Sequence, residues 1–471
     1  MADTLIVLFR RDLRLADNPA IHAAVESGLN VIPVYIHDAR RLDEGAAGRW
    51  WLHHSLIALD RDLQRLGSRL ILRRGDVARE LRMLAEECDA FAVHMSSLYE
   101  PAQLEADDGV RRSLLQAGLA VRSFDASLLN HPRRILRPTG EPYRIFTPYY
   151  DACRRRMEVQ QPLPAPGSLN RVADTLASMP IDSLGLTAGS RWLEDFREHW
   201  EPGERAAGKS LSAFVTQNLG NYSQWRDQLD RTGTSRLSPY LHWGQLSPKQ
   251  VLWACQGAGA DGAEPFTRQL FWREFAYYIL FHFPHSLSQP LDAKFENFPW
   301  RHDPVVFEAW AQGETGIPLV DAGMRELLSR GWMHNRARMV AASLLTKNLL
   351  IHWREGARHF MDSLVDADSA CNTLNWQWVA GCGVDRAPFF RIFNPATQGE
   401  KYDPDGAYIR HWLPELAKLP GKWLHRPWEA PGDALTAAGI QLGRNYPAPI
   451  VDLKASRHRA LDAWAVRLER Q

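Results

Sequence analysis

The first 130 residues alternate short apolar runs, rich in β-branched residues, with longer stretches that repeat apolar positions at helical spacing. The apolar runs cover residues 5–9, 31–37, 70–72, 91–94 and 119–124. Within residues 50–66, apolar positions recur three or four residues apart, at Leu52, Leu56, Leu59, Leu63 and Leu66. This is the period of a helix with one buried face. Because alternating strands and helices are typical of a doubly wound parallel sheet, the pattern predicts an α/β domain over residues 1–130.

The pattern changes twice beyond this domain. Residues 131–202 are rich in proline, glycine and serine, as in QQPLPAPGSLN and SMPIDSLGLTAGS, which predicts a long connector on the surface. From residue 203 onward strand patterns vanish, and helical patterns begin at Ser238-Pro239 and Ser247-Pro248. In each pair a hydroxyl is available to cap the helix and proline presets φ. We therefore expect one all-helical domain over residues 203–471.

Composition narrows the class of protein. The 471 residues are 45% hydrophobic and 24% charged, which is typical of a globular protein of two or three domains. No apolar run approaches the ~20 residues that span a bilayer, and the first run is too short for a signal peptide. The five cysteines are scattered without a CxxC pair, which argues against a disulfide framework and a four-cysteine metal site. We expect a cytoplasmic monomer that neither enters a membrane nor binds a metal.

Charge and arginine content bear on possible partners. The net charge is +1, so any surface that binds nucleic acid has to be a local patch. Eight of the 56 basic residues are lysine and the other 48 are arginine. Arginine suits bidentate phosphate contacts and stacking on rings, although codon bias in a GC-rich genome explains the excess equally simply. The first strand is followed by FRRDLRLADNP rather than GxGxxG, which argues against a dinucleotide-dependent dehydrogenase.

Two stretches combine polar and aromatic residues at helical spacing. Gln269, Trp272 and Ala276 share one stripe of an otherwise apolar helix, which fits either the lining of a cavity or a core tryptophan with a satisfied amide. After Gly331, a second helical stripe presents Trp332, Asn335, Arg336 and Met339. A concave site that both stacks on and hydrogen-bonds to its ligand has this mixture of residues.

Two further stretches carry candidate ligand-binding groups. Thr234, Ser235 and Ser238 flank Arg236 at an expected helix start, which suits a pyrophosphate but equally a capped helix with a surface arginine. The stretch DADSACNTLNWQW, residues 366–378, suggests a turn-rich pocket wall. Its Asp-x-Asp pair has no third ligand at metal-binding spacing, so a ribose or an arginine is the expected partner. We predict an ion pair between Asp366 and Arg338.

The chain resembles the DNA photolyase/cryptochrome family in several long motifs that run in family order over essentially its whole length. These are FRRDLRLADNPA, GTSRLSPYLHWG, GWMHNRARM, WREG, WQW and RIFNPATQGEKYDPDG. The family architecture is a doubly wound α/β domain joined by a long linker to a helical FAD-binding domain, in agreement with the patterns above. The resemblance implies a photolyase that uses light to repair cyclobutane pyrimidine dimers in DNA, with UV-damaged DNA as partner and FAD as cofactor.

Residue roles also follow from the resemblance. The residues matched to FAD contacts are Tyr222, Thr234, Ser235, Arg236, Leu237, Ser238, Phe266, Gln269, Arg273, Asn335, Arg338, Asp366, Ala367, Asp368 and Asn372. Among these, Asn372 matches the residue that faces flavin N5, where a neutral amide places no negative charge beside a reduced, anionic flavin.

The resemblance assigns further residues to lesion binding and to electron transfer. Those matched to lesion or DNA contacts are Gln269, Trp272, Asn335, Arg336, Met339 and Trp378. Trp376, Trp353 and Trp300 match the family's electron-relay tryptophans, from the flavin outward. Together with Asn372 they are the expected catalytic residues, because the chemistry is electron transfer by the cofactor rather than acid–base catalysis.

Departures from the family pattern leave alternatives open. Gln269 stands where photolyases of cyclobutane dimers usually have Glu, and six-four photolyases have Gln at this position. However, six-four photolyases have a second histidine where this chain has Asn335. Ala102 and Gln103 replace the residues of folate-binding relatives, whereas GRWWLHHSL and YEP resemble cryptochrome-like and deazaflavin-type members. The antenna chromophore, of folate or deazaflavin type, therefore stays undetermined. A six-four photolyase and a cryptochrome-type blue-light photoreceptor are the alternative functions.

Overall fold

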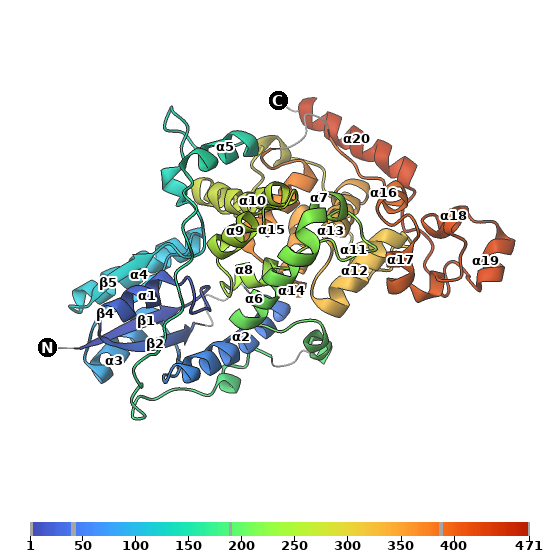
Figure 1. Ribbon diagram of the computed structural model, residues 1–471. Helices are drawn as coiled ribbons and strands as arrows, with labels where there is room; N and C mark the ends of the chain where they lie inside the picture. Colours follow the sequence, from blue (N-terminus) through green and yellow to red (C-terminus); the bar gives the residue numbers. More distant parts are fainter. Residues whose placement is uncertain (1–2, 39–43, 188–190, 386–389, 470–471) are drawn as a thin grey trace. The chain divides into compact units, whose positions relative to one another are not determined.

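The computed structural model describes residues 3–38, 44–187, 191–385 and 390–469 (Figure 1). The chain divides into two compact units, each formed from separate segments. The first unit consists of Met1–Leu193, Trp200–Gly220 and Ser235–Pro284, and the second of Glu194–His199, Asn221–Thr234 and His285–Gln471. Within the described residues, no helix is both long enough and apolar enough to cross a membrane.

The first unit is built on a five-stranded parallel sheet in the order β3-β2-β1-β4-β5 (Figure 1). The strands are β1 Thr4–Phe9, β2 Asn30–His37, β3 Ile71–Arg74, β4 Ala90–Ser96 and β5 Ala120–Phe124. Every residue of β1 after Thr4 is buried, so both faces of the central strand are covered, as expected when helices pack on both sides. The predicted α/β doubly wound fold is confirmed.

Helices connect these strands and continue beyond them in the first unit. They are α1 Pro19–Glu26, α2 Ala46–Arg65, α3 Val77–Cys88, α4 Pro101–Gln116, α5 Phe146–Arg156, α6 Glu204–Ala213, α8 Ser238–His242, α9 Pro248–Gly257 and α10 Ala263–His282. Ser247 caps α9 as predicted, since its Oγ accepts a hydrogen bond from Gln250 N–H at 2.9 Å. Ser238 instead is the first residue of α8 and makes no side-chain cap.

Helices α6, α8, α9 and α10 lie in the same compact unit as the sheet, although the sequence analysis groups them with the later helices. Buried polar contacts explain this grouping. The Trp51 indole N–H donates to Gln245 Oε1 at 3.0 Å, and the Glu204 carboxylate accepts the backbone N–H of Leu15 at 2.6 Å. The compact units therefore do not follow the expected boundaries at residues 130 and 202, and the division into antenna domain, connector and FAD-binding domain stays a prediction.

The connector contains a helix that the sequence analysis did not predict. Residues of α5 pack on α10: the Phe146 ring stacks on Trp272 at 3.8 Å, and Tyr149 lies 4.7 Å from Tyr278. Phe146, Tyr149, Tyr150 and Cys153 recur at helical spacing and are all buried. This periodicity was available in the sequence, but the surrounding prolines obscured it.

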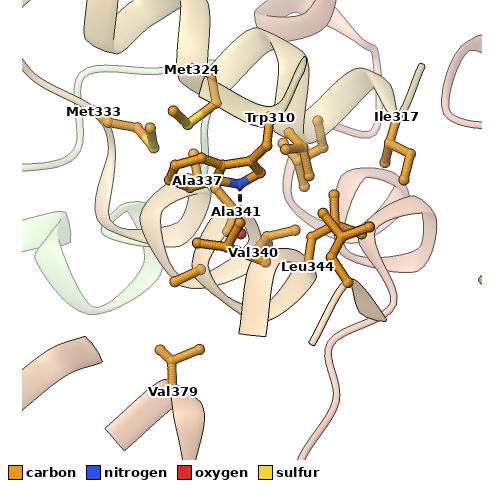
Figure 2. Close-up of a cluster of buried hydrophobic side chains, with 14 of the residues drawn as sticks. Trp310, Ile317, Met324, Met333, Ala337, Val340, Ala341, Leu344 and Val379 are labelled. Atoms are coloured by element: carbon orange, nitrogen blue, oxygen red, sulfur yellow. Dashed lines mark hydrogen bonds between the residues drawn. The ribbon is translucent and has the colours of Figure 1, made fainter. Parts of the chain in front are cut away.

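In the described part of the second unit the regular elements are helices, apart from isolated β-bridges between residues 301 and 351 and between residues 442 and 446. Its helices are α7 Tyr222–Trp225, α11 Pro304–Ala311, α12 Pro318–Arg330, α13 Asn335–Ser343, α14 Trp353–Ser363, α15 Ser369–Ala380, α16 Pro395–Tyr402, α17 Ala407–Trp412, α18 Gly421–Leu424, α19 Gly432–Ala438 and α20 Leu453–Glu469. Figure 2 shows the core around Trp310, which is fully buried and donates its indole N–H to Ala341 O at 3.0 Å. Ile317, Met324, Met333 and Leu344 lie in the same cluster (Figure 2).

Two local predictions in this unit are wrong. Trp332 does not share a helical stripe with Asn335, because α13 begins at Asn335, where His334 Nδ1 accepts the Arg336 N–H at 3.2 Å and caps the helix. The stretch expected to form a turn-rich wall is the helix α15 from Ser369 onward. Asp368 caps it by accepting the Cys371 N–H at 2.8 Å, and a capping aspartate favours a helix over further turns.

Candidate functional site

The candidate residues are divided between the two units, so each group is described within its own unit. The first unit carries Ser235, Arg236, Leu237, Ser238, Phe266, Gln269, Trp272 and Arg273. The second carries Tyr222, Thr234, Trp300, Asn335, Arg336, Arg338, Met339, Trp353, Asp366, Ala367, Asp368, Asn372, Trp376 and Trp378.

The predicted ion pair between Arg338 and Asp366 is present in the second unit. The guanidinium donates two hydrogen bonds to the carboxylate, at 3.1 and 2.9 Å, and its Nε donates to Met333 O at 2.8 Å. The Asp366 side chain is buried, whereas that of Arg338 is partly exposed. Because a bidentate pair fixes both partners, α13 and the loop before α15 are held together beside the first turn of α15.

Asn372 lies in the first turn of α15 with its carboxamide oriented by the neighbouring helix. Its Nδ2 donates to Ala357 O of α14 at 2.9 Å. A carbonyl oxygen can only accept, so the nitrogen end of the amide has to face Ala357 and Oδ1 points the other way. Asn372 therefore presents a neutral oxygen acceptor on its far side.

The three tryptophans predicted to form an electron relay belong to the second unit and differ in burial. Trp376 and Trp353 are almost completely buried, while Trp300 is partly exposed. The Trp376 ring packs edge-on against Phe360, at 5.0 Å, and against Trp310, at 6.2 Å. A Cβ on Gly356, in the turn of α14 that follows Trp353, would overlap the Trp376 ring. Glycine there lets Trp376 approach the helix that Trp353 begins.

The residues predicted to contact DNA in the second unit already have partners. Arg336 donates to Asp227 at 2.7 Å and lies over the Tyr402 ring at 4.3 Å. Asn335 is exposed, and its Nδ2 lies 3.7 Å from Met339 Sδ, one helical turn away. No sequence pattern predicts Asp227 as this partner, because it lies 109 positions before Arg336 in the chain.

Trp378, at the other end of α15, is also held by its surroundings. Its indole N–H donates to Asp385 O at 3.1 Å, and the Arg391 guanidinium lies 5.9 Å from its ring. The backbone hydrogen bond fixes the plane of the indole, so its orientation is set without a ligand.

The first-unit candidates Gln269, Trp272 and Arg273 lie on two adjacent turns of α10. Gln269 donates its Nε2–H to Pro265 O at 3.3 Å, so its Oε1 is directed away from that carbonyl. One face of the Trp272 indole is covered by Phe146, whose plane lies at 7° to it. Arg273 donates to Ser127 O at 2.8 Å and to Leu241 O at 3.4 Å, so its guanidinium ties α10 to neighbouring backbone. Phe146 is the neighbour that sequence reasoning missed.

The polar loop before α8 differs from a simple helix start. Arg236 adopts a left-handed conformation, with φ of +51°, and Ser235 Oγ accepts the Leu237 N–H at 3.3 Å. The positions of the Ser235 hydroxyl and the Arg236 side chain are therefore set by this turn and not by α8. In the second unit, burial raises the pKa of the Tyr222 phenol, so this hydroxyl stays protonated.

Comparison with known proteins identifies the family. The models for DNA photolyase and for the FAD binding domain of DNA photolyase match residues 5–167 and 266–466. The chain is 46% identical to the deoxyribodipyrimidine photo-lyase of Agrobacterium fabrum, covering 98% of this chain and 97% of that protein. The chain belongs to the DNA photolyase family. It is also 39% identical to cryptochrome-2 of Arabidopsis thaliana, covering 96% of this chain and 77% of that one.

A solved structure of the photolyase family matches the whole chain. The crystal structure of a bacterial class III photolyase from Agrobacterium tumefaciens has a TM-score of 0.97 and 45% identity, covering 100% of this chain and 98% of that chain. As a photolyase-family protein, the chain carries the FAD-binding domain, and FAD is its cofactor. That domain begins within α10 and includes the Arg338–Asp366 pair and Asn372.

Proposed function

We propose that this protein repairs cyclobutane pyrimidine dimers in UV-damaged DNA when it is illuminated. When bound and excited by light, reduced FAD would lend one electron to the dimer and take it back after the two cyclobutane C–C bonds break, so the protein has to bind, orient and tune rather than provide an acid or a nucleophile. The full-length similarity to deoxyribodipyrimidine photo-lyases supports this assignment.

The observation that carries the proposal is the orientation of Asn372. Its Nδ2 is bound to Ala357 O, so its Oδ1 is the atom offered to a ligand. An oxygen acceptor fits the N5–H of a reduced flavin, and because the amide is neutral it adds no negative charge beside an anionic cofactor. Asn372 therefore suits a flavin that works in its reduced state.

The remaining contacts to FAD are proposed from the residues that the family resemblance matches to them. Tyr222 and the stretch from Thr234 to Ser238 supply hydroxyls, backbone N–H groups and a guanidinium, which suit the phosphates and the ribityl chain. Phe266, Gln269, Arg273, Asn335, Arg338, Asp366, Ala367, Asp368 and Asn372 are proposed to line the flavin pocket.

Dimer binding is proposed to use indoles and an amide. Trp272 and Trp378 would stack on a dimer flipped out of the helix, with Met339 packed against it and Gln269 Oε1 available to hydrogen-bond its bases. Because Phe146 covers one face of Trp272, the dimer has to use the other face or the edge of that indole. Arg336 would bind phosphate, which requires it to exchange Asp227 for the DNA.

The electron relay is proposed to run from Trp376 through Trp353 to Trp300. Trp376 and Trp353 are equally buried and Trp300 is partly exposed, which supports Trp300 as the outermost indole, since that indole has to exchange electrons with reductants in the solvent. The relay restores the reduced cofactor, whereas repair draws its electron from the flavin directly.

The experiment is to measure bound cofactor and repair in the same preparation. The purified protein is expected to show flavin absorption, and a folate or deazaflavin antenna would add its own band. UV-irradiated DNA containing both cyclobutane dimers and six-four products is then incubated with it under blue light or in darkness. We expect cyclobutane dimers to decrease only in light.

Other outcomes identify the alternative functions. Loss of six-four products alone would show that Gln269 marks six-four specificity. A protein that binds flavin and changes its absorption in light, yet leaves both lesions untouched, would be a photoreceptor of the cryptochrome type. A protein without flavin would contradict every version of the proposal.

A further inference from the structure

A histidine lies between two of the proposed relay tryptophans, and the mechanism above gives it no role. The His352 ring centroid lies 5.1 Å from that of Trp300 and 5.7 Å from that of Trp353. The backbone supports this arrangement, because Arg301 N–H donates to Leu350 O at 2.7 Å and residues 301 and 351 form a parallel bridge. The segment carrying Trp300 is therefore paired with the segment carrying His352.

The backbone that leads to His352 is locally unusual. It follows the π-helical turn Leu344–Asn348 and passes through Leu350 at φ +57°, a left-handed conformation that is unfavourable for a bulky residue. Such conformations persist only where the surrounding structure determines them. The hydrogen bond from Arg301 N–H to Leu350 O is one such determinant, and it lies at the residue that turns the chain toward His352.

Hydrogen bonding determines the charge state of this histidine. His352 caps α14, and its Nδ1 accepts the Arg354 N–H at 3.1 Å. A ring nitrogen that accepts a hydrogen bond carries no proton, so the proton of the neutral ring is on Nε2. A second proton would break the cap and place a cation at the positive end of the α14 dipole. Burial and the nearby Arg354 charge lower the pKa of His352 to about 4.

We propose that His352 is a positioning residue of the electron relay, which keeps an uncharged ring between Trp353 and Trp300 while positive charge passes between them. In each step one electron moves inward, from Trp300 to Trp353 and from Trp353 to Trp376, and one positive charge moves outward. A thiol reductant in the solvent returns one electron to Trp300. A fixed cation at this distance would repel the positive charge from both outer indoles.

The inference rests on the proposed relay, and its test compares a charged with a neutral replacement. His352→Arg introduces a planar cation that can lie against the same two indoles. His352→Asn keeps a neutral cap for the Arg354 N–H. The readouts are the flavin excited-state lifetime and the yield of long-lived photoreduction with a thiol present, together with FAD content and thermal unfolding. His411→Arg is the matched control, because His411 lies 4.9 Å from Trp412, outside the relay.

We expect His352→Arg to lower the photoreduction yield at least about tenfold while the first step, from Trp376, keeps its rate. We expect His352→Asn and His411→Arg to stay within about threefold of wild type. An equal loss of photoreduction yield in the Arg and Asn variants would show that the ring acts by packing alone, which would overturn the inference. A photoreduction yield unchanged in the Arg variant would also overturn it. A Trp376→Phe protein that photoreduces normally would instead contradict the relay itself.

Nuclear magnetic resonance of histidine-labelled protein provides a readout that does not depend on photoreduction. The His352 resonances, assigned by their loss in His352→Asn, are expected to show the Nε2–H tautomer and no titration between pH 5.5 and pH 8. An imidazole that titrates near its usual value of about 6.5 would overturn the inference, because the ring would then be charged over part of this range.

Discussion

A single backbone carbonyl determines what Asn372 offers to a ligand. Ala357 O binds the Nδ2 end of the amide, which leaves the oxygen end to face away. Arg338 and Gln269 follow the same rule, since Met333 O and Pro265 O each bind a nitrogen of the side chain. At the residue scale, local backbone acceptors have therefore oriented polar groups before any ligand arrives.

Replacing Asn372 by Asp tests this orientation. A carboxylate cannot donate to Ala357 O, and it would place negative charge where we propose that the reduced flavin lies. We expect chemically reduced Asn372→Asp protein to reoxidise in air at least about tenfold faster than wild type in the dark, at equal FAD content. Asn375→Asp is the matched control on the same helix, because Asn375 also donates to a backbone carbonyl, Cys371 O at 2.7 Å, but is exposed.

Gln269 is the residue that bears most directly on the choice of lesion. Gln269→Glu should leave DNA affinity within a factor of a few, since one hydrogen bond exchanged for another rarely changes binding by more than ~1 kcal/mol. The quantum yield of cyclobutane splitting should rise modestly, because Glu can supply a proton to the dimer after it accepts an electron. Quantum yields of both proteins on both lesions measure this, and an unchanged or lower cyclobutane yield in the Glu variant would contradict it.

At the scale of elements, close helix contacts depend on particular small residues. Gly356 of α14 is an example, since a Cβ there would overlap the Trp376 ring and lie 2.6 Å from Leu345 Cδ2. Both neighbours are buried, so neither has room to move away.

We therefore expect Gly356→Ala to lower the free energy of unfolding by about 1–3 kcal/mol and to slow photoreduction by displacing Trp376. Denaturant unfolding and illumination of the oxidised protein measure the two effects. Gly208→Ala in α6 is the control, because a Cβ there meets no atom within 4 Å. It should stabilise the helix by about 0.5–1 kcal/mol and leave photoreduction unchanged.

Helix α10 is held to the end of the α/β segment by two adjacent charged residues. Glu274 is buried and accepts the backbone N–H groups of Leu129 and Asn130 at 2.6 and 2.9 Å, while Arg273 donates to Ser127 O. Burial raises the pKa of Glu274 to about 7. The folded state therefore binds the proton of this carboxyl more tightly than the unfolded state does.

Because this pKa is raised on folding, Glu274 stabilises the fold increasingly as pH falls from 8 toward 5. Glutamine does not titrate, and its amide nitrogen would face the backbone N–H of Leu129 or Asn130, so two donors would meet without an acceptor. We expect Glu274→Gln to be less stable than wild type by about 1–3 kcal/mol at pH 6, with a smaller deficit at pH 8. Denaturant titrations at both pH values measure this. Glu264→Gln on the same helix is the control, because this carboxylate is exposed and accepts from Tyr150, and it should change the free energy of unfolding by less than about 0.5 kcal/mol.

At the scale of the whole molecule, photoreduction and repair are separate uses of one cofactor. The tryptophans proposed for the relay are different residues from those proposed for lesion binding, and all three belong to the second unit. A change in the relay should therefore affect recovery of the reduced cofactor more than repair itself.

Trp376→Phe tests this separation. Phenylalanine is much harder to oxidise than tryptophan, so we expect illumination of the oxidised variant to give little reduced flavin. Repair by chemically reduced variant should proceed, because the dimer receives its electron from the flavin. Wild-type photoreduction in this variant would mean that another aromatic route dominates, and Trp310, at 6.2 Å from Trp376, is the first residue to test.

The local pattern was enough to predict the strands of the α/β segment and its helix over residues 50–66, and motif order was enough to predict the family. The Arg338–Asp366 pair spans 28 positions, so it was predicted from opposite charge rather than from local pattern, and the structure confirmed it. Periodicity, capping residues and motif order are carried by neighbours in the chain, so they can be read without coordinates. The helix of residues 369–380 was missed although its cap, Asp368, was visible, because two carboxylates and several polar residues also suit turns.

Only the tertiary structure decided which groups meet across long stretches of chain. It grouped α10 with the sheet, covered one face of Trp272 with Phe146, paired Arg336 with Asp227 and set His352 between Trp300 and Trp353. Each of these depends on packing between segments whose separation in sequence leaves no periodic signal. The sequence by itself thus determined the chemical groups and the local helices and strands. Tertiary packing determined which groups are in contact, because contact depends on proximity in the folded chain and not on separation in sequence.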